Sequence, residues 1–229
     1  MSLRRVTFVS GEYYHLYNRG NSKQKIFLDE ADYNRFLKLL FLCNSELNIN
    51  FRNVIDVTKD PLAFERGETL VDIGAFCLMP NHFHLLVREK EGGNVSLFVK
   101  KLLTAYVMYF NKKYERTGSL FEGKFKSEYA GEDNYLKYLF SYIHLNPIKL
   151  IDPKWRLEGV RDRLKAQKYA LDYEYSSYAC LGGENQKWSK IIHTNNFPRY
   201  FLDAAHYKRE IFEWLDSSPR KDLGELKEP

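Results

Sequence analysis

The sequence predicts an α+β protein in which helices pack on a mostly antiparallel sheet, with a mainly helical extension at the C-terminal end. Segments with strand and helix patterns follow one another in the order strand, helix, strand, strand, helix, strand, helix, which is typical of this class. Apolar residues make up 44% of the 229 residues, enough to form a sizeable core. After Pro153 the pattern changes to helical segments joined by turn-rich sequence. We therefore place a first domain at residues 1–152 and an extension packed on it at residues 153–229.

Four segments have the composition expected of strands. These are residues 12–19, 70–79, 82–88 and 119–129. Residues 70–79 are almost wholly apolar, which indicates a central strand buried on both faces. Pro80-Asn81 turns the chain directly after this run, so the second and third strands are expected to form a hairpin.

Five segments are expected to form helices. They are residues 30–43, 94–113, 132–145, 157–169 and 203–216. Asp29 is placed to cap the first helix, and either Asn94 or Ser96 to cap the second. Glu132 and Asp133 suit the first turn of the third helix, because negative charge there opposes the helix dipole.

Residues 44–70 do not fit this alternation, and we interpret them as an insertion or an exposed hairpin. Residues 50–57 have the composition of a strand, and Asp60-Pro61 and Gly67 break any regular element in the residues after it. The sequence contains no internal repeat and no low-complexity linker.

Composition excludes several classes of protein. The apolar fraction rules out a disordered chain, and no apolar run reaches the length of a membrane span. No secretory signal is visible, and Cys43, Cys77 and Cys180 form neither a disulfide framework nor a metal-binding CxxC pair. A cytoplasmic protein is therefore expected. The net charge of +5 permits an anionic partner without requiring one.

His82-Phe83-His84 begins the third predicted strand. Alternate side chains of a strand point the same way, so both imidazoles project from one face with Cα atoms roughly 6–7 Å apart. That spacing allows two ring nitrogens to reach one divalent metal ion, while Phe83 points into the core. For an isolated pair, two polar residues on a solvated sheet face are the simpler interpretation unless a partner group lies nearby.

Tyr142 is the second candidate, on the helix at 132–145. The buried stripe of that helix is formed by Leu136, Leu139, Phe140 and Ile143. Tyr142 lies about 110° from the centre of the stripe, at an edge where a phenol is packed yet reachable. Asn146 follows on the same side, whereas His144 points about 160° away from Tyr142. A tyrosine beside a helix core and an asparagine before a proline are also ordinary features of a helix end.

Residues 94–129 interleave basic and aromatic side chains. The basic residues are Lys100, Lys101, Lys112, Lys113, Arg116, Lys124 and Lys126. The aromatic residues are Tyr106, Tyr109, Phe110, Tyr114, Phe121 and Phe125. Seven basic against three acidic residues give this segment a charge of +4. Such a strip is able to follow a phosphate backbone and stack on bases, although a solvated helix with its aromatic residues in the core has the same pattern.

Taken together, these motifs resemble the REP-associated tyrosine transposases, which belong to the single-tyrosine transposases with a His-hydrophobic-His motif. MPNHFHLLV is followed about 60 residues later by YIHLNP. YHLYNRGN, YFNKKYERTGSLFEGKFKS and YEYSSY also resemble that family. The resemblance covers about residues 10–180.

The resemblance implies a ferredoxin-like core and a single-stranded DNA endonuclease and strand transferase. Matched residue by residue, His82 and His84 fall on the metal-binding pair and Tyr142 on the nucleophile. Asn146 falls where the wider superfamily carries a glutamine that is the third metal ligand. The implied metal is Mg²⁺ or Mn²⁺. Attack by Tyr142 leaves a 5′-phosphotyrosine and a free 3′-hydroxyl, which can later attack the phosphotyrosine of another break.

The implied partner is single-stranded DNA in hairpin-forming repeats, bound by a monomer or a homodimer. The expected DNA contacts are Arg4, Arg5, Arg19, Lys100, Lys101, Lys112, Lys113, Lys124 and Lys126. Two alternatives are open. One is a nucleic-acid-binding protein of the same fold that does not cut. The other is an unrelated metalloprotein whose histidine pair holds a structural zinc, which needs two more ligands of which Cys77 offers one.

Overall fold

The computed structural model describes residues 7–181, 187–200 and 203–215, and its centre is a four-stranded antiparallel sheet. The strands are β1 (Tyr13–Arg19), β2 (Val71–Met79), β3 (His82–Glu89) and β4 (Lys126–Tyr129). Their order in the sheet is β2-β3-β1-β4. One long helix at Glu30–Cys43 lies between β1 and β2, where a short helix at Phe51–Val57 also occurs, and another long helix at Asn94–Lys113 lies between β3 and β4. This is the ferredoxin-like arrangement, and the predicted α+β class is confirmed.

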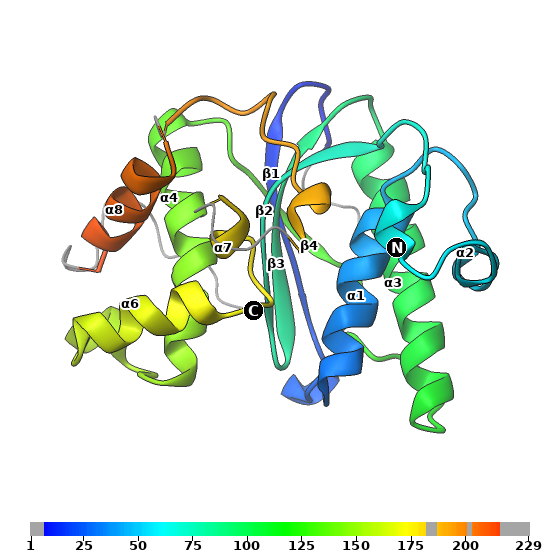
Figure 1. The fold of residues 1–229 in the computed structure, drawn as a ribbon, viewed down its shortest axis with the longest axis horizontal. Coiled ribbons are helices and arrows are strands. Elements are labelled where there is room, and N and C mark those ends of the chain that lie inside the picture. The colour runs from blue at the N-terminus through cyan, green and yellow to red at the C-terminus, as the bar shows by residue number, and fades with distance from the viewer. Residues whose placement is uncertain (1–6, 182–186, 201–202, 216–229) are drawn as a thin grey trace.

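Helices cover both faces of the sheet, which is seen nearly edge-on in Figure 1. Helices α1 (Glu30–Cys43) and α3 (Asn94–Lys113) pack on one face. The other face carries α4 (Asp133–Leu145), with α6 (Arg163–Asp172), α7 (Tyr178–Leu181) and α8 (Ala204–Glu213) around it. We call the two sides of the sheet the α1/α3 face and the α4 face. Each face carries its own hydrophobic core.

Strand β3 shows how the alternation of side chains divides the residues between these faces. Phe83 and Leu85 belong to the core on the α1/α3 face. Leu86 belongs to the core on the α4 face, and His84 shares its direction because alternate residues of a strand point the same way. Both sets are fully buried, because helices cover the sheet on each side.

The segment at 44–70 contains a short helix and a 3₁₀ turn, not a hairpin. Residues predicted as a possible strand form α2 (Phe51–Val57), and a 3₁₀ turn follows at Pro61–Ala63. Asn50 caps α2 by accepting a hydrogen bond from the Arg52 amide (2.9 Å). Strand composition was misleading here because Val54 is the one residue of α2 that is buried, so a local cap decides the conformation.

The predicted strand at 119–129 is shorter than expected. Only Lys126–Tyr129 pairs with β1, and the residues before it form a turn-rich loop with a single bridge between Gly20 and Phe121. Gly118 and Gly123 adopt positive φ angles of 83° and 113°. These left-handed conformations, which favour glycine, interrupt the extended chain before β4.

Helix α3 begins at Asn94 without either of the predicted side-chain caps. Gly93 precedes the helix with a φ of 99°, and the carboxylate of Glu89 accepts hydrogen bonds from the Val95 amide (3.2 and 3.3 Å). A buried glutamate at the end of β3 therefore satisfies the helix N-terminus in place of Asn94 or Ser96.

The C-terminal region contributes to both cores. A 3₁₀ turn (Asn146–Leu150) leads from α4 to α5 (Trp155–Glu158). Gly159, with a φ of 80°, separates α5 from α6. The single helix predicted at 157–169 is therefore two helices. Trp188 packs in the core on the α1/α3 face, and Tyr178 and Phe212 pack in the core on the α4 face.

The division of the chain into a domain at residues 1–152 and an extension at residues 153–229 stays a prediction. No helix among the described residues is long and apolar enough to cross a bilayer.

Candidate active site

His82 and His84 project from the same face of β3, as the alternation predicts. Their ring centroids are 5.0 Å apart, with an angle of 87° between the ring planes. His82 Nδ1 lies 2.7 Å from Asn81 Oδ1. Because an amide oxygen only accepts hydrogen bonds, Nδ1 carries the proton and donates it. In that tautomer the lone pair of His82 is on Nε2.

Tyr142 comes to these histidines from α4. Its ring centroid is 5.5 Å from that of His84, in an edge-on arrangement at 89°. Leu139 and Ile143 are fully buried beside it and anchor the helix on the sheet. Tyr142 itself is only 4% exposed, so it is less reachable than its position at the edge of the stripe predicted. Arg156 contributes to this burial, because its guanidinium lies over the tyrosine ring at 4.2 Å from its centroid.

His15 on β1 is part of the site and was missed by sequence reasoning. Its Nε2 lies 2.9 Å from His84 Nδ1, and its ring centroid is 5.8 Å from that of Tyr142. The alternation of β1 places His15 and Tyr17 on one face, a signal available from sequence. What the sequence lacks is the antiparallel register of β1 and β3, which sets His15 diagonally across from His84.

Burial keeps this pair of imidazoles neutral. It lowers the pKa of His15 to about 3. It also lowers the pKa of His84 well below the usual 6.5, and the positive charges of Arg156 and Lys149 act in the same direction. A neutral imidazole is the form that ligates a metal. His84 Nε2 is buried and has no hydrogen-bond partner among the described residues, as expected of a nitrogen that takes a ligand from outside the chain.

Asn146 ends α4, one turn after Tyr142, and is fully buried. Its Nδ2 donates to the Tyr142 carbonyl oxygen (2.8 Å), and its Oδ1 accepts from Arg156 (3.4 Å). The amide oxygen thus faces Arg156 in this structure. Its predicted role as third metal ligand requires it to exchange that long hydrogen bond for the ion.

The rival tyrosines of α4 have other surroundings. Tyr135 donates to Glu128 Oε2 (3.2 Å), and Tyr17 donates to Glu128 Oε1 (2.9 Å). Burial, followed by the charge of Glu128, raises the pKa of Tyr135. The ring of Tyr138 lies between Tyr142 (6.0 Å) and Trp214 (5.0 Å). The tyrosine of α4 that meets both His15 and His84 is Tyr142.

His144 points away from this site, as predicted. Its Nε2 is 2.7 Å from Ser177 Oγ and its Nδ1 is 2.5 Å from the Tyr207 hydroxyl. Burial lowers the pKa of His144 to about 3. This histidine therefore joins α4 to Ser177, directly before α7, and to Tyr207 on α8, and it points away from the site.

The four predicted DNA-binding lysines of α3 lie on the opposite face of the sheet from Tyr142. Lys101 Nζ donates to the carbonyl oxygens of Ser45 and Leu47 (2.6 Å each). Lys113 Nζ forms ion pairs with Asp29 (2.7 Å) and the buried Asp32 (2.8 Å). Lys101 and Lys113 thus hold the fold together, whereas Lys100 and Lys112 are exposed.

The aromatic residues of the same strip are mainly structural. Tyr106 and Phe110 are fully buried in the core on the α1/α3 face. Tyr109 and Tyr114 donate hydrogen bonds to the carboxylate of Asp32 (3.0 and 2.8 Å). Tyr106 and Phe110 are therefore core residues, whereas Tyr109 and Tyr114 are partly exposed and held by their hydroxyl groups.

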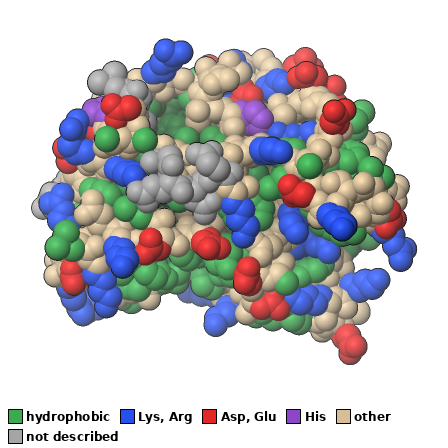
Figure 2. All heavy atoms as spheres, in the orientation of Figure 1, with side chains coloured by type: hydrophobic (Ala, Val, Ile, Leu, Met, Phe, Trp, Pro, Cys, Tyr) green, Lys and Arg blue, Asp and Glu red, His purple; other side chains and the backbone are tan. Residues whose placement is uncertain are grey.

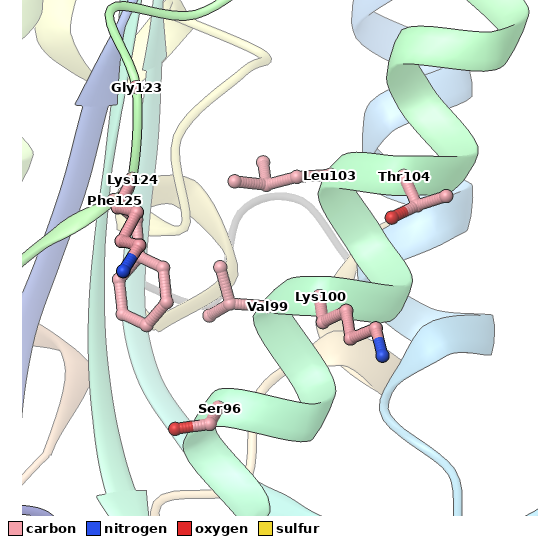
Figure 3. A pocket seen from close by; sticks show the side chains of 8 residues that line it. All are labelled: Ser96, Val99, Lys100, Leu103, Thr104, Gly123, Lys124 and Phe125. Atoms are coloured by element: carbon pink, nitrogen blue, oxygen red, sulfur yellow. The ribbon is translucent and has the colours of Figure 1, made fainter. Parts of the chain in front are cut away.

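A groove of about 330 Å³ lies between α3 and the loop before β4 (Figure 3). Val99 and Leu103 point across it toward Phe125, which comes from the loop. Lys124 lies on the loop side, whereas Lys100 points away from Phe125. The groove has an apolar floor and is not a cradle between two lysines.

The remaining predicted DNA contacts are dispersed. Arg19 pairs with Glu122 (2.9 Å), and Lys126 Nζ lies 5.7 Å from the centre of the Tyr17 ring, on the face that carries Tyr142. Arg4 and Arg5 lie outside the described residues. Figure 2 shows Lys and Arg scattered over the visible surface with Asp and Glu between them.

A structural zinc site finds no support. Among the described residues no group of three His, Cys, Asp or Glu side chains is placed to hold a metal ion. Cys77 pairs across the sheet with His84, but burial raises the pKa of its thiol, which keeps it protonated.

Comparison with known proteins places the chain in a family. A family model described as "Transposase IS200 like" matches residues 8–146, which run from before β1 to the end of α4. A solved REP-associated tyrosine transposase bound to a REP hairpin is similar, with a TM-score of 0.47 and 12% identity over 80% of this chain and 86% of that chain. No curated protein matches the chain. Because the family model covers more than half of its residues, this protein belongs to the IS200-like transposase family.

Proposed function

We propose that this protein cleaves and rejoins single-stranded DNA, with Tyr142 as the nucleophile and a divalent ion held by His82 and His84. One observation carries the proposal: Tyr142 on α4 meets His84 edge-on at 5.5 Å, and His82 lies 5.0 Å from His84 on the same strand face. A phenol and a histidine pair brought together from distant segments supply a nucleophile and an electrophilic centre. Membership of a transposase family agrees with this chemistry.

The residues present fit a divalent metal ion. The buried Nε2 of His84 has no hydrogen-bond partner among the described residues, and the tautomer of His82 leaves its Nε2 as a lone pair. Mg²⁺ or Mn²⁺ bound here would polarise the scissile phosphate and draw charge from it. Asn146 Oδ1 is the proposed third ligand.

His15 is proposed to orient His84. Metal-bound histidines usually donate their other ring N–H to a fixed partner, which sets the tautomer and the direction of the ring. His15 Nε2, at 2.9 Å from His84 Nδ1, is placed to accept that proton. This hydrogen bond leaves the lone pair of His84 on Nε2, where the proposed ion binds.

The covalent step follows from these positions. Tyr142 Oη attacks phosphorus and forms a new P–O bond, and the bond from phosphorus to the 3′ oxygen of the preceding nucleotide breaks. Tyr142 gives up its phenolic proton to solvent, and the departing 3′ oxygen takes one up. The products are a 5′-phosphotyrosine and a free 3′-hydroxyl. The reverse attack by a 3′-hydroxyl then joins strands without an external energy source.

We propose hairpin-forming repeats as the DNA, on the strength of the motifs shared with REP-associated transposases. Lys126 is the best placed of the predicted DNA contacts, because it lies over Tyr17 on the face that carries the site. Lys124 precedes it closely in the loop before β4. Both lysines are exposed and able to meet phosphates.

The test is incubation of the full chain with single-stranded DNA from the repeats that flank its gene, in Mn²⁺ or Mg²⁺. Denaturing gels should show protein attached to the 5′ end at the cut, and mass spectrometry should place the adduct on Tyr142. Tyr142→Phe should bind DNA and form no adduct, whereas the control Tyr135→Phe should form it. An adduct on another tyrosine rejects this nucleophile. DNA binding without any cleavage by the wild type supports the non-cutting alternative.

A further inference from the structure

Arg156 contacts Tyr142 from outside the segment that the family model matches. Arg156 lies on α5, ten residues beyond the end of that match. Its guanidinium carbon is 4.2 Å from the centroid of the Tyr142 ring, and its Nη2 donates to Asn146 Oδ1 (3.4 Å). The same residue therefore contacts both the proposed nucleophile and the residue that ends its helix.

The surroundings of this guanidinium are electropositive. Arg156 lies over the ring of Tyr142, and Lys149 follows Asn146 by three residues. Lys149 belongs to the 3₁₀ turn that joins α4 to α5. The short connection after α4 thus carries two cations, of which Arg156 lies directly on the buried tyrosine, and an anion that enters beside Tyr142 gains from that positive charge.

We propose that Arg156 binds the scissile phosphate at Tyr142, and that the C-terminal extension thereby supplies a catalytic residue. The inference rests on the proposed function. Arg156 covers the ring of Tyr142. In the covalent intermediate the phosphorus is bonded to the hydroxyl oxygen of that ring, Tyr142 Oη. The non-bridging oxygens then lie within reach of the guanidinium, whose planar set of donors matches two phosphate oxygens at once.

The contribution of Arg156 is largest in the transition state. A phosphodiester carries one negative charge, and attack by a phenolate oxygen adds charge at phosphorus before the 3′ oxygen leaves. A cation fixed beside that position stabilises the added charge more than the bound substrate. Arg156 exchanges its long hydrogen bond to Asn146 for the phosphate, which also frees the amide oxygen for the ion.

A purely structural role for Arg156 predicts a different outcome. In that case its loss lowers stability and leaves the rate of cleavage per folded molecule unchanged. Arg161 is the matched control, because it carries the same charge a few residues later and its side chain is 73% exposed. Arg161 pairs with Glu158 and Asp152, away from Tyr142.

The first experiment measures single-turnover adduct formation on the repeat DNA in Mn²⁺ for wild type, Arg156→Ala, Arg156→Lys and Arg161→Ala. We expect Arg156→Ala to slow the step by roughly 10²–10³-fold at saturating DNA, the usual effect of removing one donor to a developing anion. Arg156→Lys should recover part of the rate. Millimolar guanidinium ion should accelerate Arg156→Ala and leave Arg161→Ala unchanged. Melting curves establish that each variant is folded.

The second experiment needs no cleavage. Inorganic phosphate is titrated against the full chain and followed by the ³¹P line width, with about a tenfold loss of affinity expected for Arg156→Ala and none for Arg161→Ala. Phosphate binding that depends on Arg156 in a protein that forms no adduct keeps this site and rejects the proposed function. Adduct formation at the same rate with and without Arg156 keeps the proposed function and rejects this phosphate site. The absence of an Arg156-dependent effect in both experiments overturns the proposal.

Discussion

The two faces of the sheet use the same strands for opposite purposes. Phe83 and His84 are neighbours on β3, and both are fully buried. Phe83 packs edge-on against Phe121 and at 5.1 Å from Phe36, in an apolar core closed by α1 and α3. His84 meets His15 and Tyr142 under α4. Burial alone therefore does not distinguish a core residue from a site residue in this protein.

Two buried polar side chains, one on each face, differ in how their hydrogen bonds are satisfied. Asp32, on the α1/α3 face, accepts hydrogen bonds from Lys113, Tyr109 and Tyr114 and from the Leu28 amide. On the α4 face, the buried Nε2 of His84 has no partner among the described residues. A satisfied network stabilises the fold, whereas a buried nitrogen kept unpaired costs stability and is retained where it serves binding.

The largest difference between the faces should come from adjacent residues of β3. His84→Ala should abolish Mn²⁺ binding in calorimetry and reduce adduct formation by about 10³-fold or more, since a bound ion supplies several kcal/mol of transition-state stabilisation. His82→Ala should behave in the same way. Phe83→Leu should instead lower the free energy of unfolding by about 1–1.5 kcal/mol and leave Mn²⁺ affinity unchanged. Wild-type cleavage by both histidine variants would remove the metal assignment.

A smaller effect is expected for the histidine behind the ligand. His15→Phe fills the same space and removes the acceptor for His84 Nδ1–H, so Mn²⁺ affinity should fall by about 10–100-fold in calorimetry. His144→Phe is the control, since His144 is equally buried on the same face and contacts Ser177 and Tyr207 instead. Equal Mn²⁺ affinities for the two variants would show that His15 does not orient the site.

Two neighbouring lysines separate structure from DNA binding on the α1/α3 face. Lys113→Ala should lower the free energy of unfolding by about 1–2 kcal/mol, because Asp32 stays buried with one cation fewer. Lys112→Ala should change it by less than about 0.5 kcal/mol. If Lys112 meets a phosphate, as predicted, its loss should reduce the log–log salt dependence of single-stranded DNA binding by about 0.7. A loss of stability in Lys112→Ala and none in Lys113→Ala would contradict the structural role of the Lys113 ion pairs.

A further comparison is a pH dependence that arises on the α4 face. The pKa values of His15 and His144 are lowered to about 3 in the folded protein, whereas an exposed histidine titrates near 6.5. Between these values the unfolded chain binds more protons, so the free energy of unfolding falls as the pH decreases below about 6.5. Each histidine contributes about 1 kcal/mol per pH unit.

Urea unfolding at pH 7.5, 6.5, 5.5 and 5.0 measures this slope. The slope should become shallower in His15→Gln, because one imidazole that must stay neutral is gone. It should be unchanged in Phe83→Leu, which removes no titratable group. A free energy of unfolding that does not vary over this range would show that the buried histidines are able to take up protons in the folded state.

The amino-acid pattern by itself determined the class, the hairpin of β2 and β3 and the main helices of this protein, and it paired His82 with His84 and separated His144 from Tyr142. These follow from periodicity, because side chains repeat every two residues in a strand and every 3.6 in a helix. The same pattern predicted β2 as a central strand, whereas β2 lies at an edge of the sheet. Tertiary structure decided what periodicity does not encode. Register brought His15 to His84, the turn after α4 laid Arg156 over Tyr142, and α3 placed Lys101 and Lys113 on structural partners. Contacts between distant segments depend on how the elements pack, and no local pattern of residues records that.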